Sequence, residues 1–162
     1  QQPALQVRQA QQLVRLVSTS VTTTTSIFSI SYSESFTNGV TPSTQCTAWT
    51  NFVAQLTASS YLSLTMSGTF DSVGVTTTDT TVIAAIALAL RTSTSYGPVT
   101  SNGHSWVVGS CGSGYELSAG GSICACPSSD YIVRPCIGNS NFGGINTTTC
   151  SGPTQTMTVI FE

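Results

Sequence analysis

The sequence contains no lysine, and it carries only four basic and six acidic residues among 162. With a formal net charge of −2 it has no basic patch, so nucleic-acid binding has no electrostatic basis. No apolar run is long enough to cross a bilayer, and we therefore expect no membrane span.

Catalytic and metal-binding residue types are also scarce. His104 is the only histidine, no GxSxG motif is present, and no two acidic residues form a favoured pair for acid–base catalysis. The cysteines show neither the CxxC nor the His–Cys spacing of a zinc site, and there is no DxDxDG calcium loop. We therefore expect no enzymatic activity, no cofactor and no metal.

Hydroxyl side chains are abundant instead, since 27 threonines and 25 serines make up almost a third of the chain. Solubility must come from these hydroxyls, or from sugars attached to them, rather than from charge. The run Thr22, Thr23, Thr24 and Thr25 is a candidate for O-glycosylation, although threonine is also a good strand residue. Asn146 begins an N-glycosylation sequon, Asn146-Thr147-Thr148.

Six cysteines are present, and five of them lie between residues 111 and 150, in a stretch rich in Gly, Ser, Asn and Pro. Such loop-forming sequence buries little apolar surface, and cross-links are the obvious way to order it. The even count predicts three disulfides among Cys46, Cys111, Cys124, Cys126, Cys136 and Cys150, with the pairing left open. Because disulfides form in oxidising compartments, we predict an extracellular or cell-surface location.

Hydrophobic periodicity predicts helices over residues 4–16, 41–58 and 79–91. Asp79 is a suitable N-cap for the third helix, and Cys46 falls on the same face of the second helix as Trp49 and Phe52. A bridge from Cys46 would therefore tie this helix to the cysteine-rich region. Alternating or β-branched segments predict strands within 18–36, 61–70, 104–108, 131–133 and 154–161, with turns at Asn38-Gly39 and Asn102-Gly103.

This order of elements predicts an α+β fold with a mainly antiparallel sheet, two or three helices packed on one face, and a disulfide-stabilised, loop-rich C-terminal region. We predict a single domain over residues 18–162, preceded by an N-terminal arm over residues 1–17. The arm carries apolar residues at helical or alternating spacing, namely Leu5, Val7, Leu13, Val14 and Val17. We expect the arm to dock either on its own subunit or on a neighbouring one.

The favoured interpretation is a secreted, non-enzymatic structural subunit of an extracellular fibre, appendage or matrix. Residues 1–36 contain no cysteine and little charge, and a strand of this type can complete the sheet of a neighbour through main-chain hydrogen bonds. A head-to-tail contact of that kind does not close, so it generates a filamentous homopolymer. Alternatively, residues 18–36 form the first strand of their own sheet, and only residues 1–17 reach a partner.

The second interpretation is a carbohydrate-binding or adhesion module. Aromatic rings beside amide groups are a usual means of gripping a sugar, and the loop at residues 139–144 offers Asn139, Asn141 and Phe142. Further candidate rings are Trp106, Tyr115 and Tyr131. The structural alternative is that this loop is a tight turn in which Phe142 anchors the core.

Overall fold

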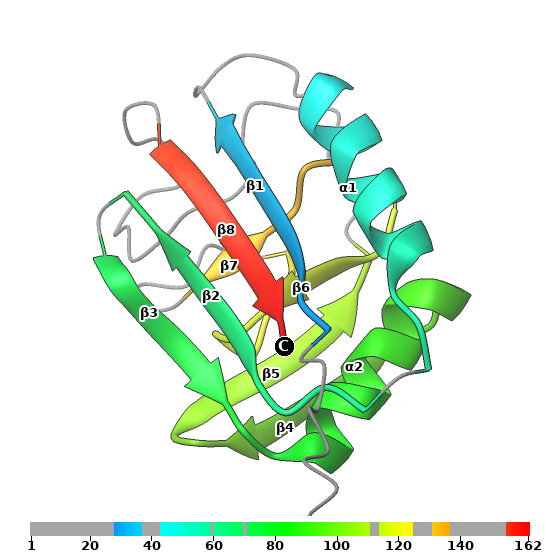
Figure 1. Cartoon of the computed structure of the whole chain (residues 1–162), viewed down its shortest axis with the longest axis vertical. Helices are drawn as coiled ribbons and strands as arrows, with labels where there is room; N and C mark the ends of the chain where they lie inside the picture. The colour runs from blue at the N-terminus through cyan, green and yellow to red at the C-terminus, as the bar shows by residue number, and fades with distance from the viewer. Residues whose placement is uncertain are drawn as a thin grey trace, which may run out of the picture.

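The computed structural model describes residues 28–36, 43–58, 60–69, 71–110, 114–124, 131–136 and 155–162. The elements in these ranges are β1 Ile30–Phe36, α1 Ser43–Gln55, β2 Leu64–Gly68, β3 Asp71–Thr77, α2 Thr80–Thr92, β4 Tyr96–Ser101, β5 His104–Gly109, β6 Glu116–Ser118, β7 Ile132–Val133 and β8 Gln155–Phe161 (Figure 1). The named strands pair antiparallel, which confirms the α+β class, and they divide between two four-stranded sheets.

Sheet A has the strand order β1-β8-β2-β3, so the last strand of the domain lies inside the sheet. β8 pairs with β1 on one side and with β2 on the other, and Val159 lies opposite both Tyr32 and Met66. The alternation predicted for β8 is confirmed, because Met157, Val159 and Phe161 are buried while the residues between them are more exposed. One face of sheet A therefore belongs to the core.

The predicted strand within residues 18–36 is present as β1, at one edge of sheet A. Its pairing with β8 runs from Ile30 opposite Phe161 to Phe36 opposite Gln155. Along β1, Ile30, Tyr32 and Phe36 are buried, and the serines between them are exposed. For residues 30–36, the alternative of a strand in the chain's own sheet is therefore correct.

Sheet B has the strand order β4-β5-β6-β7. β4 and β5 form a hairpin that turns at Asn102-Gly103, as predicted, and both turn residues have positive φ angles of 50° and 81°. Asn-Gly favours such a tight turn because both residues tolerate the left-handed region. In β5, Trp106 is completely buried, and its indole N–H donates to the carbonyl oxygen of Ser101 at 3.1 Å.

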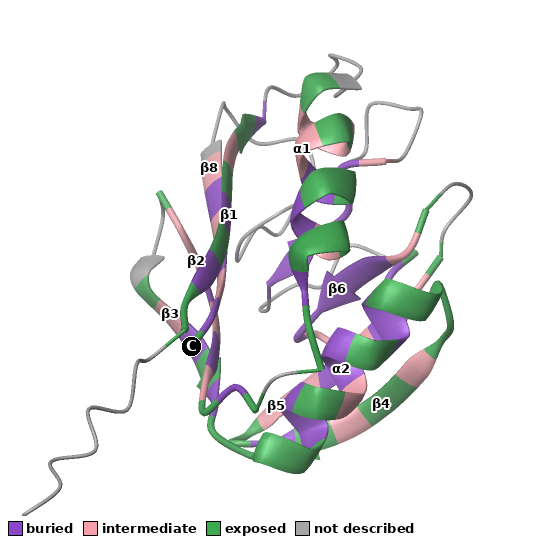
Figure 2. Ribbon diagram, turned by 45° about the vertical axis from the view of Figure 1, so that its right-hand side comes forward, coloured by how far each residue is buried: buried purple, intermediate pink, exposed green. Residues whose placement is uncertain are grey.

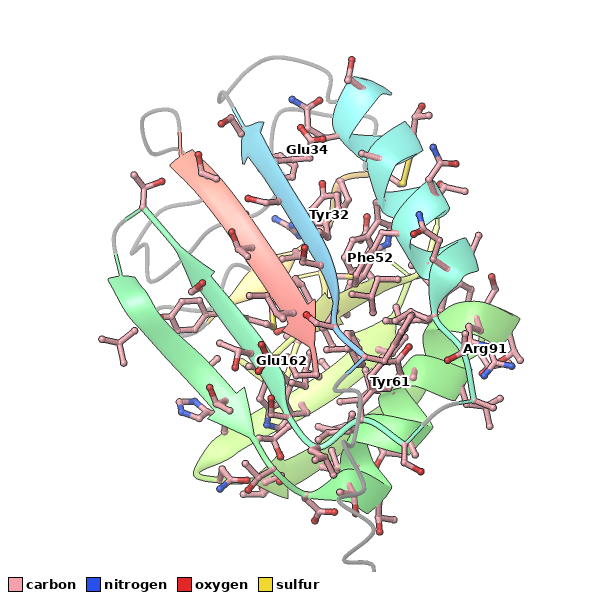
Figure 3. The ribbon with its side chains drawn as sticks, in the orientation of Figure 1. Tyr32, Glu34, Phe52, Tyr61, Arg91 and Glu162 are labelled. Atoms are coloured by element: carbon pink, nitrogen blue, oxygen red, sulfur yellow. A yellow bond between two sulfur atoms is a disulfide. The ribbon has the colours of Figure 1, made fainter. Side chains whose placement is uncertain are left out.

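The predicted helices at 41–58 and 79–91 are present as α1 and α2. α1 packs on β1 through aromatic rings. Tyr32 lies edge-on to Trp49 with centroids 5.0 Å apart. The rings of Tyr32 and Phe52 are tilted by 49°, with centroids 5.8 Å apart (Figure 3). α2 begins as predicted, because the Asp79 carboxylate accepts hydrogen bonds from the backbone N–H groups of Thr81 and Val82.

Both helices and sheet B lie on the same side of sheet A (Figure 2), as predicted for helices packed on one face. Their buried side chains form one core, which includes Trp106 from sheet B, Ile86 and Leu90 from α2, and Phe161 from sheet A. Among the described residues, no helix or strand covers the other face of sheet A. In the part of the chain that the structure describes, no helix is long and apolar enough to cross a membrane.

Three strands escaped the sequence analysis: β3, β4 and β6. β3 contains Gly74 at a φ of 69°, beside an irregularity in the pairing between β2 and β3, and a side chain there would collide with the Met66 carbonyl group. β4 begins at Tyr96-Gly97-Pro98, which resembles a turn in the sequence. The strand predicted at 61–70 starts later, at Leu64, and leaves Leu62 exposed.

Candidate functional site

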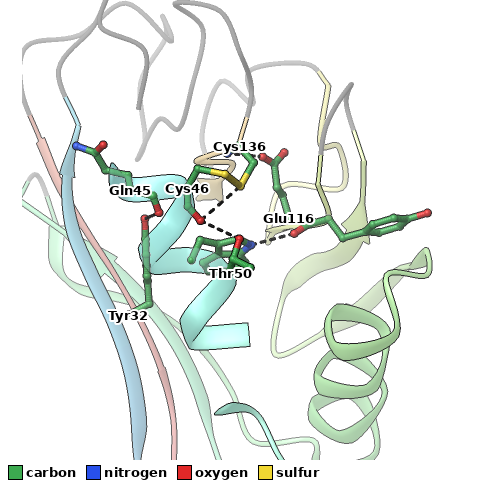
Figure 4. Close-up of a disulfide and its surroundings, with 8 residues drawn as sticks. Tyr32, Gln45, Cys46, Thr50, Glu116 and Cys136 are labelled. Carbon is green, nitrogen blue, oxygen red and sulfur yellow. Dashed lines mark hydrogen bonds between the residues drawn. A yellow bond between two sulfur atoms is a disulfide. The ribbon is translucent and has the colours of Figure 1, made fainter. Parts of the chain in front are cut away.

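A disulfide between Cys46 and Cys136 joins α1 to the end of sheet B. Cys46 lies in the first turns of α1, and Cys136 follows β7 by three residues, with their Cα atoms 4.6 Å apart (Figure 4). The predicted bridge from Cys46 to the cysteine-rich region is therefore confirmed. Cys124 is also disulfide-bonded. Cys111, Cys126 and Cys150 lie outside the described residues, so the rest of the pairing stays a prediction.

A buried carboxyl group lies beside this bridge. Glu116, the first residue of β6, is completely buried, and its Oε1 atom accepts a hydrogen bond of 3.0 Å from the backbone N–H of Cys136 (Figure 4). Its Oε2 atom is buried without a hydrogen-bond partner. Burial raises the pKa of Glu116 to about 8, against the opposing effects of the Cys136 N–H and of Arg134. Glu116 is therefore predominantly neutral at neutral pH.

Arg134 is the second ionisable group buried at this junction, with only 2% of its surface exposed. Its Nη1 atom donates to the carbonyl oxygens of Ile123 at 2.9 Å and Cys124 at 3.3 Å. Burial lowers the pKa of Arg134, and the nearby Glu116 raises it. The guanidinium group thus attaches the segment at Ile123 and Cys124 to the end of β7. Arg134 and Glu116 therefore both have a structural role.

A cleft of about 250 Å³ opens beside the disulfide, between α1, the C-terminal end of α2 and the segment before β6. Its lining residues are Trp49, Thr50, Val53, Leu90, Ser93, Gly114, Tyr115 and Cys136. The Trp49 indole N–H donates to the Tyr115 carbonyl oxygen at 2.9 Å, and the Thr50 hydroxyl donates to the Cys46 carbonyl oxygen at 3.0 Å. These hydrogen bonds hold the lining residues in place. Of the two aromatic residues that line the cleft, Trp49 is buried and Tyr115 is half-buried.

The structure separates the aromatic candidates for sugar binding. Trp106 and Tyr131 were expected to be exposed rings, but they are 0% and 3% exposed and belong to the core, so that interpretation is wrong for both. Each lies in or beside a strand of sheet B whose inner face is covered. Tyr115 alone of the three lines a cleft. Asn139, Asn141 and Phe142 lie outside the described residues.

The remaining predicted sites also fall outside the described residues. These are the arm residues Leu5, Val7, Leu13, Val14 and Val17, and the glycosylation candidates Thr22, Thr23, Thr24, Thr25 and Asn146. His104 is half-buried at the start of β5. Among the described residues, no three His, Cys, Asp or Glu side chains come together as a metal site.

Sequence reasoning missed the buried pair Glu116 and Arg134. A signal was present, because this chain has only ten charged residues and yet places two acids and one base inside its cysteine-rich stretch. Charged side chains are almost never fully buried unless they are paired or hydrogen-bonded. Glu116 and Arg134 come close in space because β6 pairs with β7. These strands are only three and two residues long, so the sequence did not reveal that they pair.

The outer face of sheet A is the second notable surface. We call it the hydroxyl face, and it consists of Ser31, Ser33, Ser35, Thr65, Ser67, Thr76, Thr156, Thr158 and Ile160. Its hydroxyls are paired across the strands: Ser33 with Thr158 at 3.0 Å, Ser35 with Thr156 at 2.9 Å, and Thr65 with Thr76 at 2.8 Å. The face combines hydrogen-bonded hydroxyls with a lack of charge.

Together these features define an α+β domain of two antiparallel sheets joined by a disulfide, with one cleft at the junction and one open, hydroxylated sheet face. Neither a family model, nor a curated protein, nor a solved structure matches this chain. Function is therefore inferred from the chain's own surfaces and buried groups.

Proposed function

We propose that this chain is a secreted, non-enzymatic structural subunit of an extracellular fibre, appendage or matrix, and that its N-terminal arm at residues 1–17 joins each subunit to the next. The observation that carries the proposal is the point at which the chain enters the fold. β1 is an edge strand of sheet A, and 29 residues precede Ile30. An arm that leaves from a sheet edge is well placed to reach the surface of a neighbouring copy.

The contact made by such an arm is heterologous, because the arm of one copy binds a different surface of the next. Contacts of this type continue from copy to copy and build a filament when the rotation does not close a ring. The apolar residues of the arm give it something to bury, and its two arginines are off the apolar face. The proposed polymer therefore needs no charged interface.

The disulfide supports the extracellular part of the proposal. The Cys46–Cys136 bridge closes a separation of 90 residues, and cross-links of this kind persist in oxidising compartments. The absence of lysine and the low number of arginines leave few peptide bonds for trypsin-like proteases. Both properties suit a durable protein outside the cell.

Negative-stain electron microscopy tests the proposal directly. The intact chain should form filaments at neutral pH, and a chain lacking residues 1–17 should give discrete particles with the same circular dichroism spectrum. Leu13→Asp with Val17→Asp should act like the deletion, whereas Gln11→Ser with Gln12→Ser, on polar positions of the same arm, should leave filaments intact. Discrete particles from the intact chain, or filaments without the arm, would contradict the proposal.

A second candidate function, carbohydrate binding, is favoured by the cleft beside the disulfide. The cleft combines the half-buried Tyr115 with the hydroxyl-bearing residues Thr50 and Ser93, and residue 139 follows its lining residue Cys136 by three positions. A glycan array read with the intact chain, with Tyr115→Ala and with Tyr96→Ala as a matched control would test it. Binding lost only in Tyr115→Ala supports this function, and binding by none of the three excludes the cleft.

A further inference from the structure

We propose that the hydroxyl face of sheet A is a second contact surface, through which two copies of this chain pack face to face and hold neighbouring filaments side by side. The inference rests on the proposed function, since it assumes copies already joined by their arms. It adds a lateral interface to the head-to-tail contact. The partner surface is the same face of a second copy.

The charge distribution favours a second copy as the occupant. In a face-to-face contact related by a two-fold axis, each patch meets itself, so a charged patch would repel its own image. No residue of the hydroxyl face is charged. Glu162, the nearest acid along β8, lies beyond the end of that strand, where it accepts a hydrogen bond from Ser63 (Figure 3). Self-pairing therefore meets no electrostatic barrier.

The cost of removing water from this face is also low. Three cross-strand hydroxyl pairs keep hydrogen bonds within the copy when the face is covered, whereas an unpaired hydroxyl would lose its water partner. Serine and threonine are short, so little side-chain entropy is lost when they are immobilised. Ile160, half-buried among them, adds apolar surface to the contact.

The size of the face decides what kind of contact it can make. Strands about 4.8 Å apart and side-chain rows about 6.6 Å apart give the nine positions of the face an area of roughly 300 Å². Stable protein complexes bury about 800 Å² per partner, so one pair of faces binds weakly. Copies held in line by their arms present many faces at once, and the contacts then act together. Lateral pairing should therefore accompany filament formation.

Thr158→Arg tests this contact in the intact chain. Thr158 lies at the centre of the face, opposite Ser33 and Ser67, and an arginine there would meet the same arginine of the second copy. Thr94→Arg is the matched control, because the Thr94 hydroxyl is likewise bonded to a threonine hydroxyl, but Thr94 is an exposed residue that follows α2. Electron microscopy should show paired filaments for the native chain and for Thr94→Arg, and single filaments for Thr158→Arg.

Two further measurements keep this inference separate from the arm. If Thr158→Arg fails to fold by circular dichroism, Ser33→Lys on the edge strand places a charge in the same row. If the intact chain forms no filaments, the proposed function fails, and sedimentation equilibrium at millimolar concentration then tests the face alone. A weak dimer lost in Thr158→Arg supports the face. Pairing unchanged by the charge, no dimer, or O-glycans on Thr65, Thr76 or Thr158 of the native protein would overturn it.

Discussion

The strands of sheet A and those of sheet B are buried in different patterns. Sheet A buries one face and leaves the other open, so apolar and hydroxylated residues alternate along β1 and β8. In sheet B, all of β6 and β7 is buried, including the polar residues Glu116 and Ser118. An open sheet face is encoded by the strand alone, whereas a sheet covered on both faces depends on whatever segments cover it.

Among the described residues, two of the connections between the sheets differ in kind. The Cys46–Cys136 bridge joins α1, which packs on sheet A, to the end of sheet B. Elsewhere, the buried hydroxyl of Thr77 at the end of β3 lies 2.6 Å from the Ser101 hydroxyl and donates to Asn102 Oδ1 at 3.1 Å. One connection is covalent and the other consists of hydrogen bonds, so they should contribute very different amounts to stability.

The largest effect should come from removing the covalent connection with Cys46→Ser and Cys136→Ser together. A cross-link over 90 residues restricts the unfolded chain strongly, and its loss should lower the free energy of unfolding by roughly 4–5 kcal/mol. Urea denaturation measures this change. Hydrogen exchange should show that the amides of β6 and β7 lose protection before those of β8, because sheet B depends on the bridge.

A control variant, Thr44→Ser, changes an exposed residue in the same turn of α1 and should leave stability within about 0.5 kcal/mol of the native chain. A loss of less than about 1 kcal/mol in the double cysteine variant would show that non-covalent packing alone holds sheet B. Equal loss of protection in both sheets would mean that the two sheets unfold as one unit. The sheets would then differ in how their residues are buried, but not in stability.

Three strands of sheet A, namely β1, β2 and β8, and both helices could be predicted from the sequence because their signals are local. Each signal lies within one short stretch of sequence: the alternation in β8, the Asp79 cap of α2 and the apolar face of α1. β6 is too short for periodicity, and the pairing of the predicted strand β7 with β6 has no local signal. The burial of Glu116 also depends on Cys136, twenty residues later in the chain. The bridge from Cys46 could be predicted. To predict the buried Glu116 beside it, the pairing of β6 with β7 would have to be known.

The second effect concerns the acid that sheet B buries. The pKa of Glu116 is raised from 4.5 to about 8 by burial, so between these pH values the unfolded chain loses a proton that the folded chain keeps. Below pH 4.5 the contribution of Glu116 is fully present, and it is lost as the pH rises through about 8. The free energy of unfolding should therefore fall by up to about 1.4 kcal/mol per pH unit across this range.

Glu116→Gln isolates this contribution, because glutamine keeps an acceptor for the Cys136 N–H but does not titrate. Urea denaturation at several pH values should give a flatter profile for the variant than for the native chain, and the difference cancels the other titrating groups. Thr44→Ser, which changes an exposed and non-titrating residue, serves as the control and should retain the native profile. Equal slopes for Glu116→Gln and the native chain would show that the carboxyl group is already ionised at neutral pH.

The smallest change in the free energy of unfolding is expected from substituting two adjacent threonines of β3, which face opposite sides of sheet A. Thr77→Val keeps the shape of a completely buried side chain but leaves the Asp79 N–H and the Asn102 amide oxygen without the Thr77 hydroxyl, at a cost of about 1–3 kcal/mol. Thr76→Val removes one exposed hydroxyl pair with Thr65, which water replaces, and should change stability by less than about 0.5 kcal/mol. Urea midpoints at equal m-values measure both changes. If the two variants lost equal stability, the hydrogen bonds between the sheets would be worth no more than those on the open face, and the disulfide would be the principal connection between sheet A and sheet B.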